Sequence, residues 1–429
     1  MPTSHQLVTH LFLQLAVLLV ASRVMGWLFQ RLGQTQVVSE MITGVLLGPS
    51  LLGLIAPDVQ SFLFPTKLAL VIDGTTKTIG HPSMLLLLGL SQVGLVLYMF
   101  IVGLEFNTEL LSKHWKSAGT ISLAGVVAPI CLGGALGLIL VGQPGLYTDI
   151  VAPWQAALFM GAAMLITAFP MLARIVYESG ISNTRIGTLV ISAAAFDDAI
   201  AWALLAIVVA TSKNSPQVAA LAIGGGIVYF VVMALVGKPL FHRLFAQVKN
   251  SEQSFQIKPF VLLLTILMIC AWFTDEVGIY SIFGAFVAGT MMPRCEFIQS
   301  TRRSIEPLTV TVLLPIFFVY SGLNTQLNLL VQPSLLGIAI VVILVAILCK
   351  GVACSIGARF GGMNWQEASL IGVLMNARGL MELLLVNIGR DNGLISPALF
   401  SILVLMTICT TATASPLFKL LSRKILHTA

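Results

Sequence analysis

Two adjacent aspartates, Asp197 and Asp198, lie in the middle of the apolar stretch LVISAAAFDDAIAWALLAIVV, residues 189–209. A carboxylate accepts up to four hydrogen bonds and can instead take up a proton, so this pair could bind a proton or a cation. Consecutive residues of a helix diverge by about 100°, because one turn takes 3.6 residues. The two carboxylates therefore cannot share one face of the helix, and we expect them to have different roles.

Lys350 is the natural partner for one of these aspartates. It lies in VVILVAILCKGVACSIGARF, residues 341–360, and it is the only lysine deep within an apolar run. A lysine near a helix end can extend its ammonium group to the membrane surface. Lys350 precedes Arg359 by about 13 Å at 1.5 Å per residue, which makes that alternative difficult. A purely structural ion pair with Asp197 remains the other interpretation.

Two further apolar runs are interrupted. In MLITAFPMLARIV, residues 164–176, Pro170 lacks an amide hydrogen, so backbone groups near Ile166 and Thr167 lose helical partners. In GVLMNARGLMELLLVNIG, residues 372–389, the interruption comes from polar residues and one glycine, namely Asn376, Arg378, Gly379 and Glu382. Both stretches are predicted to be discontinuous helices. Arg378 and Glu382 are four residues apart and could pair, in either a structural or a gating role.

The elements that carry these residues are membrane helices. Hydrophobic residues make up 57% of the 429 positions and charged residues only 9%, against roughly a quarter charged in soluble domains. Apolar runs long enough to span a bilayer follow one another along the chain. We predict an all-α polytopic membrane protein that forms a single domain over residues 1–429. Its thirteen predicted helices cover residues 7–28, 37–55, 85–103, 117–142, 154–177, 186–211, 217–245, 259–274, 279–293, 305–323, 334–358, 366–388 and 397–421.

The location of basic residues predicts the orientation, because cytoplasmic loops retain Lys and Arg. One side holds fourteen of them, Arg31, Lys113, Lys116, Arg185, Arg243, Lys249, Lys258, Arg294, Arg302, Arg303, Arg359, Lys419, Arg423 and Lys424. The other side holds four, Lys67, Lys77, Lys213 and Arg390. We therefore expect the N-terminus outside and the C-terminus in the cytoplasm. The net charge of +6 reflects this topology, and nucleic acid is not an expected partner.

Several other functions are disfavoured. The six cysteines have no paired spacing, the six histidines form no metal-binding pair, and no phosphate-binding Gly-x-x-x-x-Gly-Lys loop is present. We predict no enzyme activity and no resident cofactor. An intramembrane aspartyl protease would need its two carboxylates on separate helices, whereas Asp197 and Asp198 are contiguous.

Weak sequence similarities within the chain indicate an inverted repeat. GLEFNTEL (103–110) ends the third predicted helix and GLNTQL (322–327) ends the tenth. Small residues four apart recur in the second helix, at Gly44 and Gly48, and in the ninth, at Ala285 and Gly289. Helices seven apart cross the membrane in opposite directions, which predicts repeats made of helices 2–6 and 9–13. Such repeats place a binding site near the midplane, where discontinuous helices meet.

Four motifs in order, TAFPMLARI, SAAAFDDAIAW, LLPIFFVYSGLNTQL and MNARGLMELLLVNIG, resemble the monovalent cation:proton antiporter-2 family. The resemblance implies a homodimer with crossed discontinuous helices. It implies scaffold or dimerisation helices (1–110 and 259–327), a mobile core (117–211 and 334–423) and a connecting segment (212–258). It also implies that Asp198 binds the cation, that Asp197 faces Lys350, and that Thr167 contributes ligands at a crossing supported by Pro170, Asn376, Arg378 and Glu382.

The predicted function is secondary active exchange of a monovalent cation for protons by alternating access. Burial disfavours a charged carboxylate and a nearby cation favours it, so Asp198 can hold either a proton or a cation. With an aspartate at position 197, the chain resembles the electrogenic sodium/proton exchangers of this family. We therefore favour Na⁺ over Li⁺ or K⁺ as the transported cation. A K⁺/H⁺ exchanger and a sodium-coupled symporter of an organic solute are the alternatives. The expected location is the bacterial plasma membrane, and the expected partners are lipid, the transported ions and a second protomer.

Overall fold

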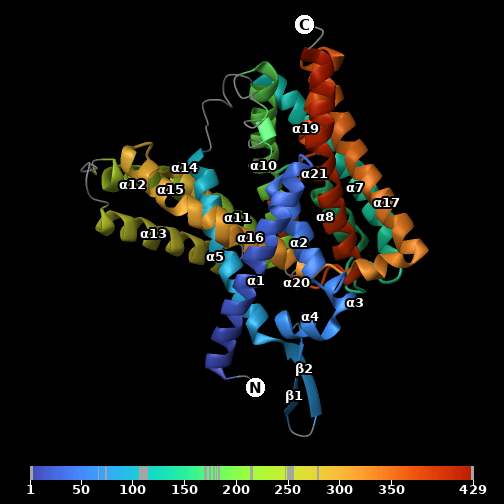
Figure 1. The fold of residues 1–429 in the computed structure, drawn as a ribbon. Coiled ribbons are helices and arrows are strands. Elements are labelled where there is room, and N and C mark those ends of the chain that lie inside the picture. The colour runs from blue at the N-terminus through green and yellow to red at the C-terminus, as the bar shows by residue number, and fades with distance from the viewer. Residues whose placement is uncertain are drawn as a thin grey trace. The chain divides into compact units, whose positions relative to one another are not determined.

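The computed structural model describes residues 3–426 except 66, 73–74, 106–114, 169–171, 173–174, 177–178, 180, 182–183, 213–215, 247, 249–255 and 278–279. Within these residues the chain is almost entirely helical (Figure 1). Nine of the described helices are long and apolar enough to cross a membrane, or ten if one bent pair counts as a span. The prediction of an all-α polytopic membrane protein is therefore confirmed, whereas the number thirteen remains a prediction.

The chain divides into two compact units. The first comprises residues 1–85, 107–208 and 318–429, and the second comprises residues 86–106 and 209–317. Three helices belong partly to each unit, namely α5 (Pro82–Glu105), α10 (Arg185–Ser212) and α16 (Leu314–Leu323). Contacts within one conformation do not report which helices move, so the functional division into scaffold and core remains a prediction.

The first unit contains every described residue of the predicted site. Its remaining elements are α1 (Ser4–Arg31), α2 (Gln36–Leu47), α3 (Leu52–Ile55), α4 (Pro57–Leu63), β1 (Lys67–Ile72), β2 (Thr75–Gly80), α7 (Trp115–Val141), α8 (Pro153–Leu165), η3 (Leu327–Val331), α17 (Pro333–Ile347), η4 (Leu348–Val352), α18 (Ala353–Phe360), α19 (Trp365–Met375), α20 (Leu380–Asp391) and α21 (Pro397–Leu426).

The short elements of this unit were not predicted, namely α4, β1, β2 and η3. β1 and β2 form an antiparallel hairpin in which Lys67 pairs with Gly80 and Ile72 with Thr75. No element was expected between residues 55 and 85, because no apolar run there is long enough to span a membrane. The hairpin is the exception to an otherwise helical fold.

The second unit consists of α11 (Pro216–Val232), η1 (Met233–Gly237), α12 (Lys238–Phe245), α13 (Ile257–Glu276), α14 (Ser281–Met291), α15 (Glu296–Leu308) and η2 (Thr309–Leu313), together with most of α5. Tyr229 donates a hydrogen bond from its hydroxyl to the Gly284 carbonyl, which joins α11 to α14. Arg302 of α15 pairs with Glu105 at the end of α5 and with Glu306 on its own helix.

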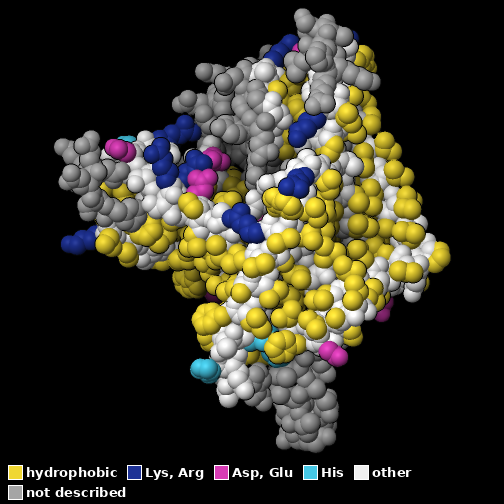
Figure 2. Space-filling model, viewed as in Figure 1, with side chains coloured by type: hydrophobic (Ala, Val, Ile, Leu, Met, Phe, Trp, Pro, Cys, Tyr) yellow, Lys and Arg dark blue, Asp and Glu magenta, His cyan; other side chains and the backbone are white. Residues whose placement is uncertain are grey.

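Burial separates helices that face lipid from helices that form the interior of the first unit. On α17, Leu336, Ile340 and Leu344 are exposed, and hydrophobic side chains cover this helix in Figure 2. On α20, every residue from Leu380 to Gly389 is buried. A helix that is buried on all sides lies in the interior of a bundle. The unit thus surrounds α20 with protein, although α20 carries the acidic residue Glu382.

Candidate functional site

Two interrupted helices meet at the centre of the first unit. α8 ends at Leu165, and Ile166, Thr167 and Ala168 continue in non-helical backbone. The interruption lies where the sequence predicted it, although Pro170 itself lies outside the described residues. α19 ends at Met375 and α20 begins at Leu380, with a bend of 41° between them.

The two non-helical segments are bonded to each other where they cross. The amide of Ala168 donates to the carbonyl of Ala377 over 3.1 Å. Arg378 follows Ala377 in the chain. Its backbone amide donates to the Thr411 hydroxyl, and this hydroxyl donates to the backbone carbonyl of Arg378. Non-helical backbone at membrane depth is tolerated only when its polar groups find partners inside the protein. Thr411 of α21 provides such partners, and its role was not predicted from the sequence.

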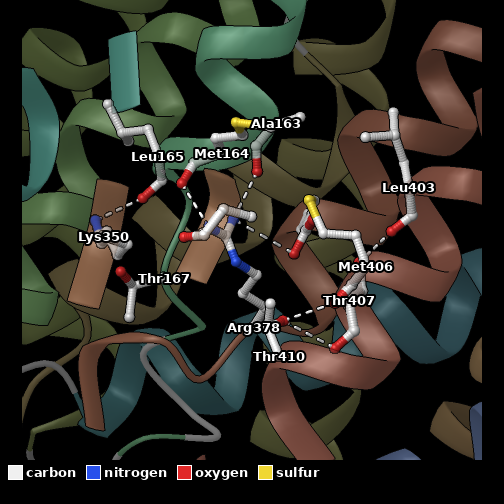
Figure 3. Close-up of polar contacts among 12 residues, drawn as sticks. Ala163, Met164, Leu165, Thr167, Lys350, Arg378, Leu403, Met406, Thr407 and Thr410 are labelled. Atoms are coloured by element: carbon white, nitrogen blue, oxygen red, sulfur yellow. Dashed lines mark hydrogen bonds and ion pairs between the residues drawn. The ribbon is translucent and has the colours of Figure 1, made fainter. Parts of the chain in front are cut away.

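Two buried cations cap the end of α8. The last carbonyls of a helix lack intrahelical donors and carry a partial negative charge. Lys350 donates to the Leu165 carbonyl at 2.6 Å, and Arg378 donates to the carbonyls of Ala163 and Met164 at 2.8 and 2.7 Å. Figure 3 shows both side chains directed at this helix end. The two cations therefore compensate the partial negative charge of the α8 terminus.

Lys350 reaches this position from an irregular turn. It lies in the π-helical turn η4, which interrupts the long helix formed by α17 and α18. Its ammonium also donates to the Gly125 carbonyl of α7 at 2.9 Å and to Asp197 Oδ2 at 2.6 Å. With Leu165 these make three acceptors for three N–H donors, so the buried ammonium is fully hydrogen-bonded. π turns inside helices often occur at functional sites.

Asp197 is equally well satisfied. Its Oδ1 accepts a 2.6 Å hydrogen bond from the Ser122 hydroxyl, and its Oδ2 accepts from Lys350 and, at 3.2 Å, from the Thr167 hydroxyl. The carboxylate is completely buried. Ser122 could not be singled out from the sequence, because α7 carries several hydroxyl residues and only one faces this carboxylate. Thr167, predicted as a cation ligand, donates to Asp197 in this conformation.

Asp198 presents the opposite situation. It is 1% exposed, and neither carboxylate oxygen has a hydrogen-bond partner among the described residues. An ionised carboxylate in such a place costs several kcal/mol unless a proton or a cation compensates it. The structure thus distinguishes the two adjacent aspartates, since one is fully paired and the other is buried with both oxygens free.

Asn376 and Glu382 lie beside the crossing. The Asn376 amide donates to the Ile347 carbonyl at 3.4 Å, next to the π turn, and its own carbonyl oxygen has no partner among the described residues. Glu382 is fully buried with its Oε2 3.8 Å from Arg378 Nη1, a distance too long for a hydrogen bond. The predicted pairing of Arg378 and Glu382 is therefore present as a loose ion pair.

Buried charges beside two interrupted membrane helices are typical of a class of membrane protein, the secondary transporters. The chain belongs to the sodium/hydrogen exchanger family, because the model of the transmembrane sodium/hydrogen exchanger matches residues 18–423. The family prediction made from the four motifs is thereby confirmed.

Individual relatives agree with this assignment. The Na⁺/H⁺ antiporter NhaS4 of Synechocystis sp. is 38% identical over 407 residues, which cover 94% of each chain. The K⁺/H⁺ antiporter 1 of Saccharomyces cerevisiae is 30% identical over 95% of this chain, which spans only 46% of the yeast protein. The structure of the sodium proton antiporter MjNhaP1 from Methanocaldococcus jannaschii covers 96% of this chain with a TM-score of 0.63 at 15% identity. At that identity, the structural likeness shows a shared fold.

Proposed function

We propose that this protein exchanges a monovalent cation for protons at Asp198 by alternating access. The observation that carries the proposal is the contrast between the two buried aspartates. Asp197 accepts from three donors, whereas Asp198 has none among the described residues. A carboxylate in that environment needs a positive partner, and a proton and a monovalent cation compete for the same oxygens. Competition for one site couples the two fluxes without ATP.

Suppression of leak follows from the same cost. When Asp198 is empty and ionised, moving it between the two faces of the membrane exposes an uncompensated charge to a low-dielectric interior. The loaded site, with either a proton or a cation, carries no such penalty. Asp197 and Lys350 are positioned to take part in the exchange, and Thr167 joins the cation ligands if its hydroxyl turns away from Asp197.

The names of two relatives support Na⁺ and K⁺ as candidate cations. NhaS4, the more similar of the two relatives described above, is a Na⁺/H⁺ antiporter, and the yeast relative is a K⁺/H⁺ antiporter. We favour Na⁺ for this chain and retain K⁺ as the second candidate. Parallel titrations of proton flux with NaCl, LiCl and KCl in proteoliposomes would distinguish them.

Close helix packing supports the inverted repeat. A Cβ at Gly44 would meet the Val319 carbonyl, three residues before Gly322, and a Cβ at Gly322 would meet the Met41 carbonyl, three residues before Gly44. In the second unit Gly103 and Gly289 show the same relation, because their Cβ atoms would meet the carbonyls of Phe286 and Phe100. Gly44 and Gly322 lie in predicted helices 2 and 10, and Gly289 and Gly103 lie in predicted helices 9 and 3. The two pairs of helices therefore pack in the same way. Two repeats of helices 2–6 and 9–13 account for this correspondence.

The remaining features of the proposal come from the sequence. They are thirteen membrane helices, a homodimer held by the scaffold segments, a mobile core, an external N-terminus and electrogenic exchange in the bacterial plasma membrane. The apolar exposed faces of helices such as α17 are compatible with contact to lipid.

The central test is Asp198→Asn in proteoliposomes. A neutral amide cannot release a proton or balance a cation, so we expect sodium-dependent proton flux to disappear while the protein still folds. Thermal melting in detergent checks the folding. Undiminished sodium-dependent proton flux in a folded Asp198→Asn protein would refute the assignment of Asp198.

A further inference from the structure

A second buried carboxyl group, that of Glu382, has few hydrogen-bond donors around it. Glu382 lies in the first turn of α20, its side chain has no exposed surface, and neither of its oxygens accepts a hydrogen bond of good geometry from the described residues. The Thr407 hydroxyl of α21 is the donor that lies near it. An ionised carboxylate is normally stabilised by several donors, as Asp197 is. The mechanism proposed for Asp198 gives no reason for a second carboxyl group in this condition.

Arg378 does not fill this role in the observed conformation. Its Nη1 donates to Ala163, and its Nη2 donates to Met164 and, at 3.3 Å, to Ala346. Both terminal nitrogens are thus used by backbone carbonyls, and Nη1 remains 3.8 Å from Glu382. Figure 3 shows Arg378 reaching toward α8 and away from the threonines of α21.

No other charged side chain comes from α8 or α21, the helices with the most extensive described contacts to α20. Over their described lengths, α8 has no Asp, Glu, Lys, Arg or His, and α21 has none before Lys419. Among the described residues, Arg378 is the charged group that acts on Glu382. A proton on the carboxyl group removes the cost of a buried charge that is only loosely paired.

A group that takes up and releases a proton must be stable in its ionised form as well. The surroundings of Glu382 can stabilise its carboxylate. Glu382 lies at the positive end of α20, where a negative charge is stabilised, and the Arg378 guanidinium is close enough to turn toward it. Arg378 Nε has no acceptor among the described residues, so the guanidinium has a donor to offer.

Three hydroxyl groups lie on one face of α21, and the Thr407 hydroxyl is near Glu382. Thr407, Thr411 and Ser415 are four residues apart, so they share one face of the helix, and each is buried. Thr411 already bonds the backbone of Arg378. Side chains four apart on a helix have Cβ atoms about 5–6 Å apart, so one water molecule can bridge each step.

We propose that Glu382 is a second proton-binding site, separate from the exchange site and loaded along the Thr407–Thr411–Ser415 face of α21. One O–H bond forms on the Glu382 carboxylate as one O–H bond breaks on the neighbouring hydroxyl or water, which is re-protonated from the next. The net change is uptake of one proton. The proposal rests on the assignment of Asp198 as the exchange site, because it assigns to Glu382 a proton that the cation does not displace.

Infrared difference spectroscopy of the purified full-length protein tests the proposal, because protonated carboxyl groups have a distinct carbonyl stretch. We expect Glu382→Gln to lose one pH-dependent band and Asp198→Asn to lose another. Saturating NaCl should remove the Asp198 band and leave the Glu382 band. If Glu382→Gln retains every protonated-carboxyl band, or if NaCl also removes the Glu382 band, the proposal is overturned. A Na⁺-insensitive Asp198 band would instead contradict the exchange site.

Two measurements keep the test decisive if Glu382→Gln fails to fold. Isotope-labelled glutamate in the unmodified protein should shift the Na⁺-insensitive band and leave the Asp198 band unchanged; the absence of any shifted band overturns the proposal. For the route, Thr407→Val should slow deuterium exchange at Glu382 several-fold. Thr413→Val is the matched control, because Thr413 is exposed and donates to its own helix. Equal exchange in both variants would exclude the route.

Discussion

The hydrogen bond from Ser122 to Asp197 provides a test of whether Asp197 moves during transport. In the structure Asp197 is held by Ser122, Thr167 and Lys350, the arrangement that movement of Asp197 would require of the cation-free state. If cation binding at Asp198 draws Asp197 into the site, the bond from Ser122 must break. If Asp197 stays with Lys350, the bond from Ser122 persists in both states. Ser122→Ala separates these two cases.

The magnitude follows from the geometry. Ser122 is 3% exposed and its hydroxyl lies 2.6 Å from Asp197 Oδ1, and a hydrogen bond to a charged group contributes about 1.5–3 kcal/mol. Ser122→Ala should destabilise the cation-free state by that amount. If the bond is absent from the cation-bound state, the apparent KM for Na⁺ should fall by roughly ten- to a hundredfold, at 1.4 kcal/mol per tenfold.

The assay is Na⁺-dependent proton flux in proteoliposomes, with melting temperature in detergent measured on the same preparations. Thr120→Ala is the matched control, because it removes a hydroxyl from α7 that donates only to the Ser117 carbonyl. A lower melting temperature with an unchanged KM in Ser122→Ala would refute movement of Asp197. A lower KM in Thr120→Ala as well would show that the effect does not come from the bond to Asp197.

Three further variants test the site and the packing. Thr167→Val should raise the apparent cation KM more than it lowers maximal flux if the hydroxyl turns to the cation, and an unchanged or lower KM would remove Thr167 from the ligands. Lys350→Gln leaves the buried Asp197 without its counter-ion, which costs about 3–5 kcal/mol, and in any folded protein it should shift the reversal potential toward electroneutral exchange. Gly289→Val should lower the melting temperature, because its side chain would meet the Phe100 carbonyl; Gly337→Val, with nothing within 4 Å, is the control, and equal melting would contradict the packing argument.

The sequence was sufficient for the fold class, the family and the main ionisable residues, because each leaves a local signal. Asp198 and Lys350 stand out since a charge inside an apolar run is expensive, and the helix interruptions stand out through Asn376 and Arg378. The hairpin of β1 and β2 left no comparable signal in a search for apolar periodicity. Ser122 and Thr411 also left none, because a single hydroxyl in a membrane helix is common and becomes informative only through what it faces.

The same limit explains the roles of the two cations. From the sequence, Lys350 and Arg378 were expected to pair with carboxylates, and no local pattern indicates that both would also cap α8. Helix termini are neutralised by whatever the fold brings near them, and here that partner lies about 185 residues away for Lys350 and 215 for Arg378. A contact of that separation is a property of the fold, so it cannot be derived from a motif.

This capping bears on how many protons accompany each cation. If Asp197 leaves Lys350, the ammonium keeps the carbonyls of Gly125 and Leu165, and the latter carries the partial negative charge of the α8 terminus. These acceptors stabilise the charged lysine, which opposes release of its proton and favours one-for-one exchange. Loss of the counter-charge in a low-dielectric interior has the opposite effect and favours exchange of two protons. The second effect is larger if Asp197 moves fully away, because a half-charge at a helix end compensates less than a whole carboxylate does. Electrogenic exchange therefore depends on the movement of Asp197 that the Ser122 variant measures, and a voltage-independent reversal point would require the aspartate to remain paired.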